Sequence, residues 1–200
     1  MVDCAHGFRP FAQSFRDSHL CPDLVGLGGY NGFSYADIST SVQISKATIH
    51  HHFPTKAELV QTVLKRYREQ ARAGIEAMDH TIKDPVRRLG AYTGYWEACI
   101  SDDTASMCVC AMLAAELPAI PSQVADEVRG HFIDLTAWLA KVLQAGATTG
   151  AFKLRQTPDV EAMTLMATIH GAMLSARAYR DPGIFKAIVS PAVKQLSRPA

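Results

Sequence analysis

The sequence has no apolar run long enough to cross a membrane. Hydrophobic residues make up 48% of its 200 residues and charged residues 20%, but no stretch approaches the 18 or more consecutive apolar residues of a membrane helix. The N-terminus also lacks the short apolar stretch, bounded by small residues, that is typical of a secretory signal. We therefore expect a cytoplasmic protein of one or two small domains that does not bind membranes.

Cysteine usage excludes the common cysteine-based scaffolds. No two cysteines form a Cys-x-x-Cys pair, and an odd number of cysteines argues against a disulfide framework. The five cysteines are Cys4, Cys21, Cys99, Cys108 and Cys110. This usage is typical of a reduced, cytosolic protein without a zinc finger.

Sequence signatures of catalysis and cofactor binding are missing as well. The chain has no Gly-x-Ser-x-Gly, phosphate loop or dinucleotide fingerprint, and no Glu-x-x-His spacing of the kind that builds a di-metal oxidase. Three consecutive histidines, His50 to His52, point about 100° apart on a helix and cannot converge on one metal ion. We expect no enzymatic activity, no metal and no other cofactor.

No segment shows a strand pattern, whereas apolar residues recur with the helical period along most of the chain. The fold class predicted from this periodicity is all-α. The predicted helices cover about 10–20, 34–42, 46–53, 55–79, 85–100, 108–117, 122–146, 160–179 and 184–196.

Residues 34–59 carry most of the functional information. Ser34 and Asp37 form a capping-box-like start for a short helix, and Ser45 is a good N-cap for a second short helix. Pro54 ends the second helix, because the residue before a proline is pushed out of the helical region. The two helices are joined by a turn at residues 42–44. Such a pair is a helix-turn-helix, in which the second helix enters the DNA major groove.

The same residues resemble a known motif. The chain reads Asp37-Ile38-Ser39, then Ile44-Ser45-Lys46-Ala47-Thr48-Ile49-His50-His51-His52-Phe53, then Pro54-Thr55-Lys56-Ala57-Glu58-Leu59. This pattern resembles the helix-turn-helix of the tetracycline-repressor-like (TetR/AcrR) family of bacterial regulators. Two positions depart from the family pattern. Gln43 stands where glycine is usual, and His50 stands where tyrosine is commonest.

The resemblance implies a domain order. Residues 1–54 would be the three-helix DNA-binding domain, residues 55–82 a connecting helix, and residues 83–200 a helical bundle for ligand binding and dimerisation. Residues 1–29 are atypical, because they are glycine-rich in part and lack the long first helix that the family usually has.

Charge supports a DNA-binding function for the motif. The net charge is only +1 over the whole chain, but residues 34–72 contain six lysines and arginines against three acids. Residues 73–200 contain twelve bases and thirteen acids. The basic excess therefore lies on the motif, as expected for an electrostatic footprint on DNA.

We expect the first turn of the second helix to face the base edges and its surroundings to hold phosphates. The base-facing candidates are Ser45, Lys46, Ala47 and Thr48, and the phosphate-binding candidates are Ser34, Tyr35, His50, His51 and Lys56. For Lys56, the argument is its place in the first turn of the long helix, beside free backbone N–H groups.

The second half of the chain offers a candidate dimer face and a candidate ligand pocket. Small residues along 160–179 permit close helix approach, and this helix with the last one, 184–196, forms the dimer interface that the resemblance implies; an ordinary core helix is the alternative. The resemblance also implies a pocket for a small-molecule effector. Its candidate lining residues, for which core packing is the alternative, are Tyr92, Trp96, Cys99, Met107, Met112, Phe132, Trp138, Met166 and His170.

Function is therefore predicted as ligand-responsive regulation of transcription. We expect a repressor that binds a palindromic double-stranded DNA operator as a homodimer and is released by a small molecule. The alternative is a helical small-molecule-binding or thiol redox-sensing protein with an impaired DNA-binding head. Cys108 is the candidate redox thiol for that alternative, although its apolar surroundings favour a buried packing residue.

Overall fold

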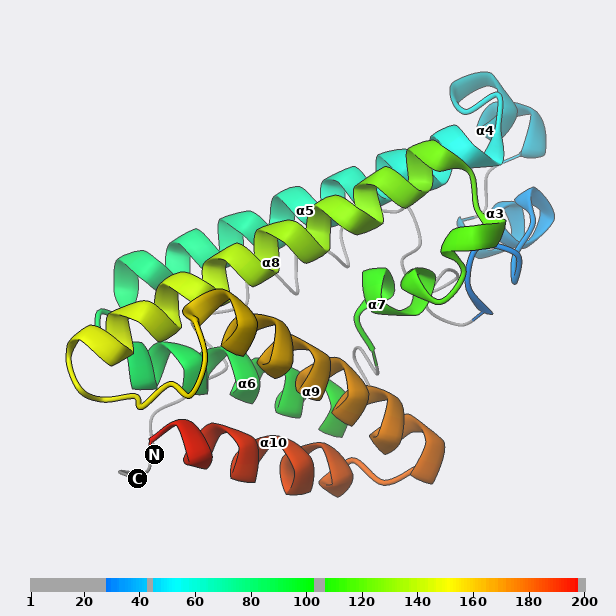
Figure 1. The fold of residues 1–200 in the computed structure, drawn as a ribbon. Coiled ribbons are helices and arrows are strands. Elements are labelled where there is room, and N and C mark those ends of the chain that lie inside the picture. The colour runs from blue at the N-terminus through cyan, green and yellow to red at the C-terminus, as the bar shows by residue number, and fades with distance from the viewer. Residues whose placement is uncertain (1–27, 43–44, 103–106, 198–200) are drawn as a thin grey trace. The chain divides into compact units, whose positions relative to one another are not determined.

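The computed structural model describes residues 28–42, 45–102 and 107–197, and all regular elements in these ranges are helical (Figure 1). The prediction of an all-α fold is confirmed. The elements are α3 (Tyr35–Val42), α4 (Lys46–His52), α5 (Lys56–Thr81), α6 (Pro85–Ser101), α7 (Val109–Ala114), the 3-10 helix η1 (Leu117–Ala119), α8 (Ser122–Thr148), α9 (Pro158–Tyr179) and α10 (Gly183–Leu196). The predicted helix at 10–20 and the turn residue Gln43 lie outside the described residues.

Capping residues explain where several helices begin. Ser45 accepts a hydrogen bond from the backbone N–H of Thr48 at the start of α4. Asp84 caps α6 in the same way, with Pro85 in the first turn, where its missing N–H is not needed. Thr157 caps α9. Ser45 is the cap that the sequence analysis predicted, and each of the three helices begins at the residue after its cap.

One predicted helix is shorter than expected. The apolar run 108–117 was predicted to form a single helix, but α7 ends at Ala114 and the chain continues into the 3-10 helix. Pro118 is the cause, because it has no N–H for a helical hydrogen bond and disfavours helical backbone at the residue before it.

The chain divides into two compact units that are not consecutive in sequence. Among the described residues, the head unit comprises 28–42, 45–73 and 109–132, and the bundle unit comprises 74–102, 107–108 and 133–197. The helices α5 and α8 each contribute one part to both units.

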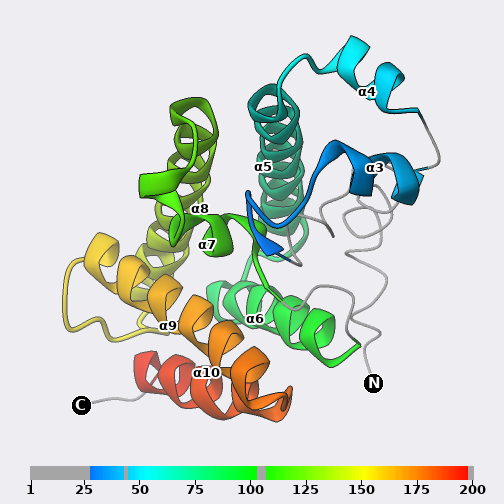
Figure 2. The ribbon, with the colours of Figure 1, turned by 90° about the vertical axis from the view of Figure 1, so that its right-hand side faces the viewer.

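The head unit contains α3, α4, α7, η1 and the first parts of α5 and α8. Figure 2 shows α4 beside the beginning of α5, with α3 below α4. Its apolar core includes Ile38 of α3, Ile49 of α4 and Leu64 of α5. Arg68 of α5 pairs with Glu127 of α8 (Nη1–Oε2, 3.3 Å).

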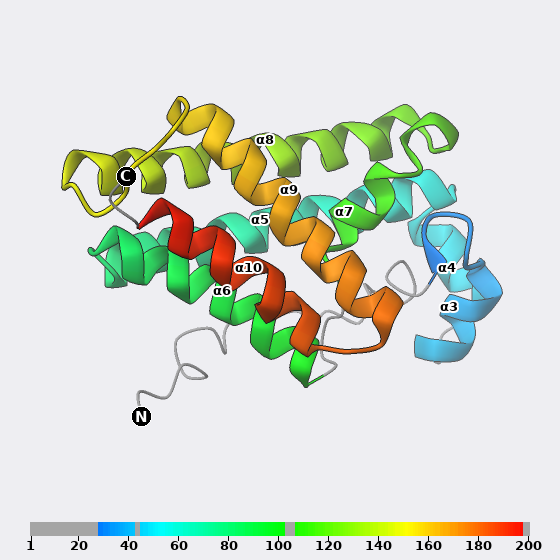
Figure 3. The same ribbon diagram turned by 60° about the horizontal axis from the view of Figure 1, so that its bottom comes forward.

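The bundle unit contains α6, α9, α10 and the remaining parts of α5 and α8. Figure 3 shows α9 and α10 side by side. Trp138 of α8 donates its indole N–H to Asp79 of α5 (3.0 Å), and the guanidinium of Arg88 pairs with the same carboxylate (3.2 Å). Arg88 also donates to the carbonyl of Ile82 just beyond α5. None of the described helices combines the length and the apolar character that crossing a lipid bilayer requires.

Candidate nucleic-acid interface

The first turn of α4 is exposed and rests on a buried anchor. The side chains of Lys46, Ala47 and Thr48 are all exposed, whereas Ile49 is only 4% exposed. Burial of Ile49 fixes which side of this short helix faces the core. The predicted base-facing residues therefore lie on the outer side of α4.

Within this turn, two hydroxyls are already engaged with each other. Ser45 Oγ accepts from the backbone N–H of Thr48 (3.1 Å) and lies 2.8 Å from Thr48 Oγ1. This arrangement holds the helix start in place. The side chains of Lys46 and Ala47 take no part in this cap.

The helix before the turn begins with the predicted capping box. Asp37 Oδ2 accepts from both the backbone N–H and the hydroxyl of Ser34 (2.7 Å each), while Ser34 Oγ accepts from the backbone N–H groups of Ala36 and Asp37 (3.2 and 3.4 Å). These hydrogen bonds to Ser34 lower the pKa of the Asp37 carboxyl below its ordinary value. Ser34 thus has a structural partner at the place where a phosphate contact was predicted.

Tyr35 connects α3 to the end of α4. Its hydroxyl donates to the carbonyl of Phe53 (2.8 Å), and its ring meets that of His50 edge-on, with centroids 4.3 Å apart. Because the phenol proton is used inside the head unit, Tyr35 positions α4 more directly than it reaches outward. His50 and His51 are exposed.

Lys56 also points into the head unit. Its ammonium donates to the carbonyl of Phe33 and lies over two aromatic rings, 4.1 Å from the centroid of Phe33 and 5.0 Å from that of Tyr30. Burial lowers the pKa of Lys56, and the nearby carboxylates of Asp37 and Glu116 oppose this shift. The geometry supports a bracing role and weighs against the phosphate contact predicted from its place in the helix.

Glu116 is a residue of the head unit that the prediction of site residues missed. Its Oε2 accepts the backbone N–H of Tyr30 (3.0 Å), and its Oε1 sits so close to Gly29 that a Cβ there would lie 1.6 Å from it. Gly29 has a positive φ of 72°, so glycine suits this turn in both backbone and space. The signal in the sequence was a single acid in the apolar run 108–117.

The predicted pocket residues divide between the two units. Met112 and Phe132 belong to the head unit, and the other seven belong to the bundle unit. Within the bundle unit, the rings of Tyr92 and Trp138 meet edge-on at 5.2 Å, and Thr136 contacts Met166. The remaining predicted lining residues vary in burial: Trp96 and Cys99 are buried, and Met107 and His170 are half-buried.

Neutral polar groups gather around the middle of α6. Burial raises the pKa of the Tyr92 and Tyr95 phenols far above their ordinary value, and the neighbouring thiols Cys108 and Cys99 act in the same direction. The indole nitrogen of Trp96 is buried and interacts with the Tyr92 phenol, but it completes no hydrogen bond of standard geometry with the residues that the structure describes. These groups can donate hydrogen bonds without carrying charge.

Cys108, the candidate redox thiol, is 1% exposed. A sensing thiol needs access to its oxidant or electrophile. The burial of Cys108 therefore favours a packing role over the alternative redox function.

Two short helices with an anchored, exposed second helix, followed by a long helix and a bundle, define a helix-turn-helix regulator. Two family models match the chain. The model described as "Bacterial regulatory proteins, tetR family" matches residues 23–63, and the model described as "Tetracyclin repressor-like, C-terminal domain" matches residues 85–190.

Individual proteins that are similar to this chain are transcriptional regulators. A crystal structure of a TetR-family transcriptional regulator from Agrobacterium tumefaciens is 46% identical, with 95% of this chain and 99% of that chain covered and a TM-score of 0.86. The HTH-type transcriptional repressor DhaR of Mycobacterium sp. (strain GP1) is 25% identical over 154 residues, 76% of each chain. A TetR regulator from Legionella pneumophila shares the fold at 20% identity, with a TM-score of 0.78, covering 98% of this chain and 100% of that one.

The chain therefore belongs to the TetR family of bacterial transcriptional regulators. The resemblance stated from residues 34–59 is confirmed, as is the prediction of a regulator rather than an enzyme.

Proposed function

We propose that the chain forms a homodimer that represses transcription from a palindromic operator and leaves it when a small-molecule effector binds. The observation that carries this proposal is the exposed first turn of α4, with Lys46 and Ala47 free on a helix anchored by Ile49. In a helix-turn-helix, the N-terminal residues of the second helix contact base edges. Thr48 and the flanking His50 and His51 complete the contact surface.

The dimer proposal is supported by an uncovered apolar face on α9. Large apolar side chains on it are well exposed: Met163 is 50% exposed, Leu174 56% and Val160 41%. Ala167, Gly171 and Ala178 are exposed on the same helix, whereas Ala162, Ala172 and Ala176 are buried. The small residues are thus divided between two faces. Those on the exposed face allow another helix to approach closely.

This proposal can be tested by oligomeric state and operator binding together. The single chain has a mass of 21.8 kDa, and light scattering after size exclusion should give twice that mass. Leu174→Lys should produce monomers and abolish binding to a palindrome selected from random duplexes, because one head reads too few bases alone. Ile133→Lys, at an equally exposed apolar residue of α8 (68% exposed), is the matched control and should stay dimeric. A wild-type monomer, or one without preference among duplexes, would overturn the proposal.

The effector proposal is supported by the buried indole of Trp96. A buried donor without a well-formed hydrogen bond costs up to roughly 1–3 kcal/mol, and an acceptor on a bound molecule would recover part of this cost. A thermal-shift screen of small neutral compounds should identify a ligand that releases the operator. Trp96→Phe should weaken that ligand about tenfold, a loss of roughly 1.4 kcal/mol, and leave operator affinity unchanged. An effector that binds Trp96→Phe equally well would exclude this anchor.

A further inference from the structure

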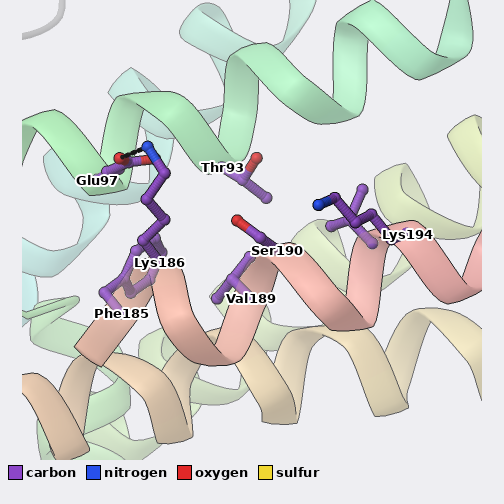
Figure 4. Close-up of a pocket in the computed structure, with 8 residues that line it drawn as sticks. Thr93, Glu97, Phe185, Lys186, Val189, Ser190 and Lys194 are labelled. Atoms are coloured by element: carbon purple, nitrogen blue, oxygen red, sulfur yellow. Dashed lines mark hydrogen bonds and ion pairs between the residues drawn. The ribbon is translucent and has the colours of Figure 1, made fainter. Parts of the chain in front are cut away.

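The bundle unit has a small hollow between α6 and α10, and none of the predicted pocket residues lines it (Figure 4). Its volume is about 200 Å³, which is below the roughly 300 Å³ at which sites for drug-sized ligands begin. The residues that line it are Thr93, Glu97, Phe185, Lys186, Val189, Ser190, Val193 and Lys194. Only a small molecule fits this space.

The hollow contains two lysines and one carboxylate, so its charges do not cancel. The ammonium of Lys186 pairs with Glu97 Oε1 (2.8 Å), and this hydrogen bond raises the pKa of Lys186. The ammonium of Lys194, in contrast, has no ion pair or hydrogen bond with the residues that the structure describes. One pair and one free cation leave a net charge of one positive unit.

A hydroxyl donor lies next to this free cation. Figure 4 shows Ser190 and Thr93 facing each other across the hollow, with the ammonium of Lys194 directed toward the space between them. Thr93 Oγ1 already donates to the carbonyls of Leu89 and Gly90 (3.2 Å each). Ser190 is half-buried and its hydroxyl has no such partner among the described residues. Lys194 and Ser190 are therefore the groups free to donate to an anion.

The rest of the hollow is apolar. Phe185 (1% exposed) and Val189 (3% exposed) form its floor, and the half-buried Val193 lies on the same helix. Hydrocarbon placed against these side chains would be removed from water, which is favourable.

We propose that this hollow binds a small organic monocarboxylate. Its carboxylate accepts hydrogen bonds from Lys194 Nζ and Ser190 Oγ, and its hydrocarbon part packs on Val189 and Val193. A single negative charge matches the single uncompensated positive charge. A dianion such as phosphate is disfavoured, because it would lie near the carboxylate of Glu97 and offers nothing to the valines.

The test uses the purified 200-residue protein and benzoate as the probe, and binding is measured by ligand-observed NMR titration. The contact with an exposed lysine is screened by water, so we expect a dissociation constant of about 1 mM. Lys194→Gln removes the charge and shortens the side chain by one atom while keeping it polar, and it should weaken benzoate binding about fivefold. Lys141→Gln, at an exposed lysine of α8 in the same unit, is the control and should change nothing. Benzamide, which has the same ring without the charge, should bind at least tenfold more weakly than benzoate.

A second variant tests the charge argument directly. Glu97→Gln frees Lys186, so the hollow should then hold two uncompensated cations. Benzoate should bind more tightly to this variant, and inorganic phosphate should begin to compete with it. Absence of benzoate binding to the wild type, equal binding to Lys194→Gln, equal binding of benzamide, or competition by phosphate at the wild-type site would each overturn the proposal.

Discussion

The head unit and the bundle unit differ in what holds their helices together. In the head unit, polar contacts fix the positions of short helices: Tyr35 bonds the end of α4, Lys56 bonds Phe33, and Glu116 bonds Tyr30. The bundle unit has polar contacts too, at Asp79, but its long helices also enclose side chains that are wholly inaccessible, such as Leu139 and Ile169. Short helices bury too little apolar surface to fix their orientation alone, so directional bonds do this in the head unit.

This difference means that the residues needed for stability and those proposed to recognise DNA are different residues. The exposed side of α4 is not needed for folding, since Ile49 anchors the helix and Ser45 caps it. The proposed base-facing positions are therefore free of structural constraint, and substitutions there should affect DNA binding rather than folding. Substitutions in the core of the bundle unit should therefore lower the stability of the protein, whereas substitutions on the exposed side of α4 should lower its affinity for the operator.

The largest loss of stability is expected in the core of the bundle unit. Leu139→Ala removes a fully buried side chain and leaves a cavity, so the free energy of unfolding should fall by about 3 kcal/mol. Chemical denaturation followed by circular dichroism measures this change. Lys141→Ala, two residues along α8 and exposed, should stay within about 0.5 kcal/mol of the wild type. A loss below about 1 kcal/mol in Leu139→Ala would show that the core is loosely packed.

On α4 we expect a substitution to weaken operator binding without lowering stability. Ala47→Glu places a negative charge at the proposed base-facing turn, so it should weaken operator binding about a hundredfold by repulsion from phosphates. The same carboxylate lies in the first turn of a helix, where negative charge is tolerated or favourable. The thermal midpoint should therefore stay within a degree or two of the wild type. Unchanged binding, measured by fluorescence anisotropy on the selected operator, would remove α4 from the interface.

A third variant distinguishes bracing from phosphate contact at Lys56. If Lys56 contacts a phosphate, its replacement should lower the salt dependence of operator binding by about one unit of slope. The observed contacts predict instead that Lys56→Met lowers the stability of the head unit by roughly 1 kcal/mol, through loss of the hydrogen bond to Phe33, with nearly the wild-type salt slope. Lys65→Met, at an exposed lysine of the same helix, is the control for nonspecific charge effects. A slope reduced by a full unit in Lys56→Met, but not in Lys65→Met, would restore the phosphate role.

Much of the fold could be predicted because its signals are local. Ser45, Asp84-Pro85 and Thr157 specify helix starts through contacts within three residues, and the periodicity of apolar residues specifies the helices between them. The motif at 34–59 was sufficient to indicate the family for the same reason.

The contacts of Lys56 and Glu116 within the head unit could not be predicted in this way. Each depends on residues that are distant in the sequence: Lys56 bonds Phe33, and Glu116 bonds Tyr30, 86 residues away. Local reasoning placed Lys56 toward DNA because it lies in the first turn of a helix. The α6–α10 hollow was missed for a similar reason, since its Lys186–Glu97 pair joins residues 89 apart.

The smallest effect is expected from the capping box of α3, and it should depend on pH. The pKa of Asp37 is lowered by its hydrogen bonds to Ser34, so its contribution to stability is present above the ordinary carboxyl pKa and is lost as pH falls through the lowered value. Asp37→Asn should therefore lower the thermal midpoint by roughly 1–2 °C at pH 7, and the difference from the wild type should shrink below about pH 4. Asp126→Asn, at an exposed acid of the same unit that pairs with Arg129 at the surface, should show no comparable loss. The opposite outcome is a thermal midpoint of Asp37→Asn that differs from that of the wild type by the same amount at pH 7 and below pH 4. In that case the ionised carboxylate of Asp37 would not stabilise the start of α3.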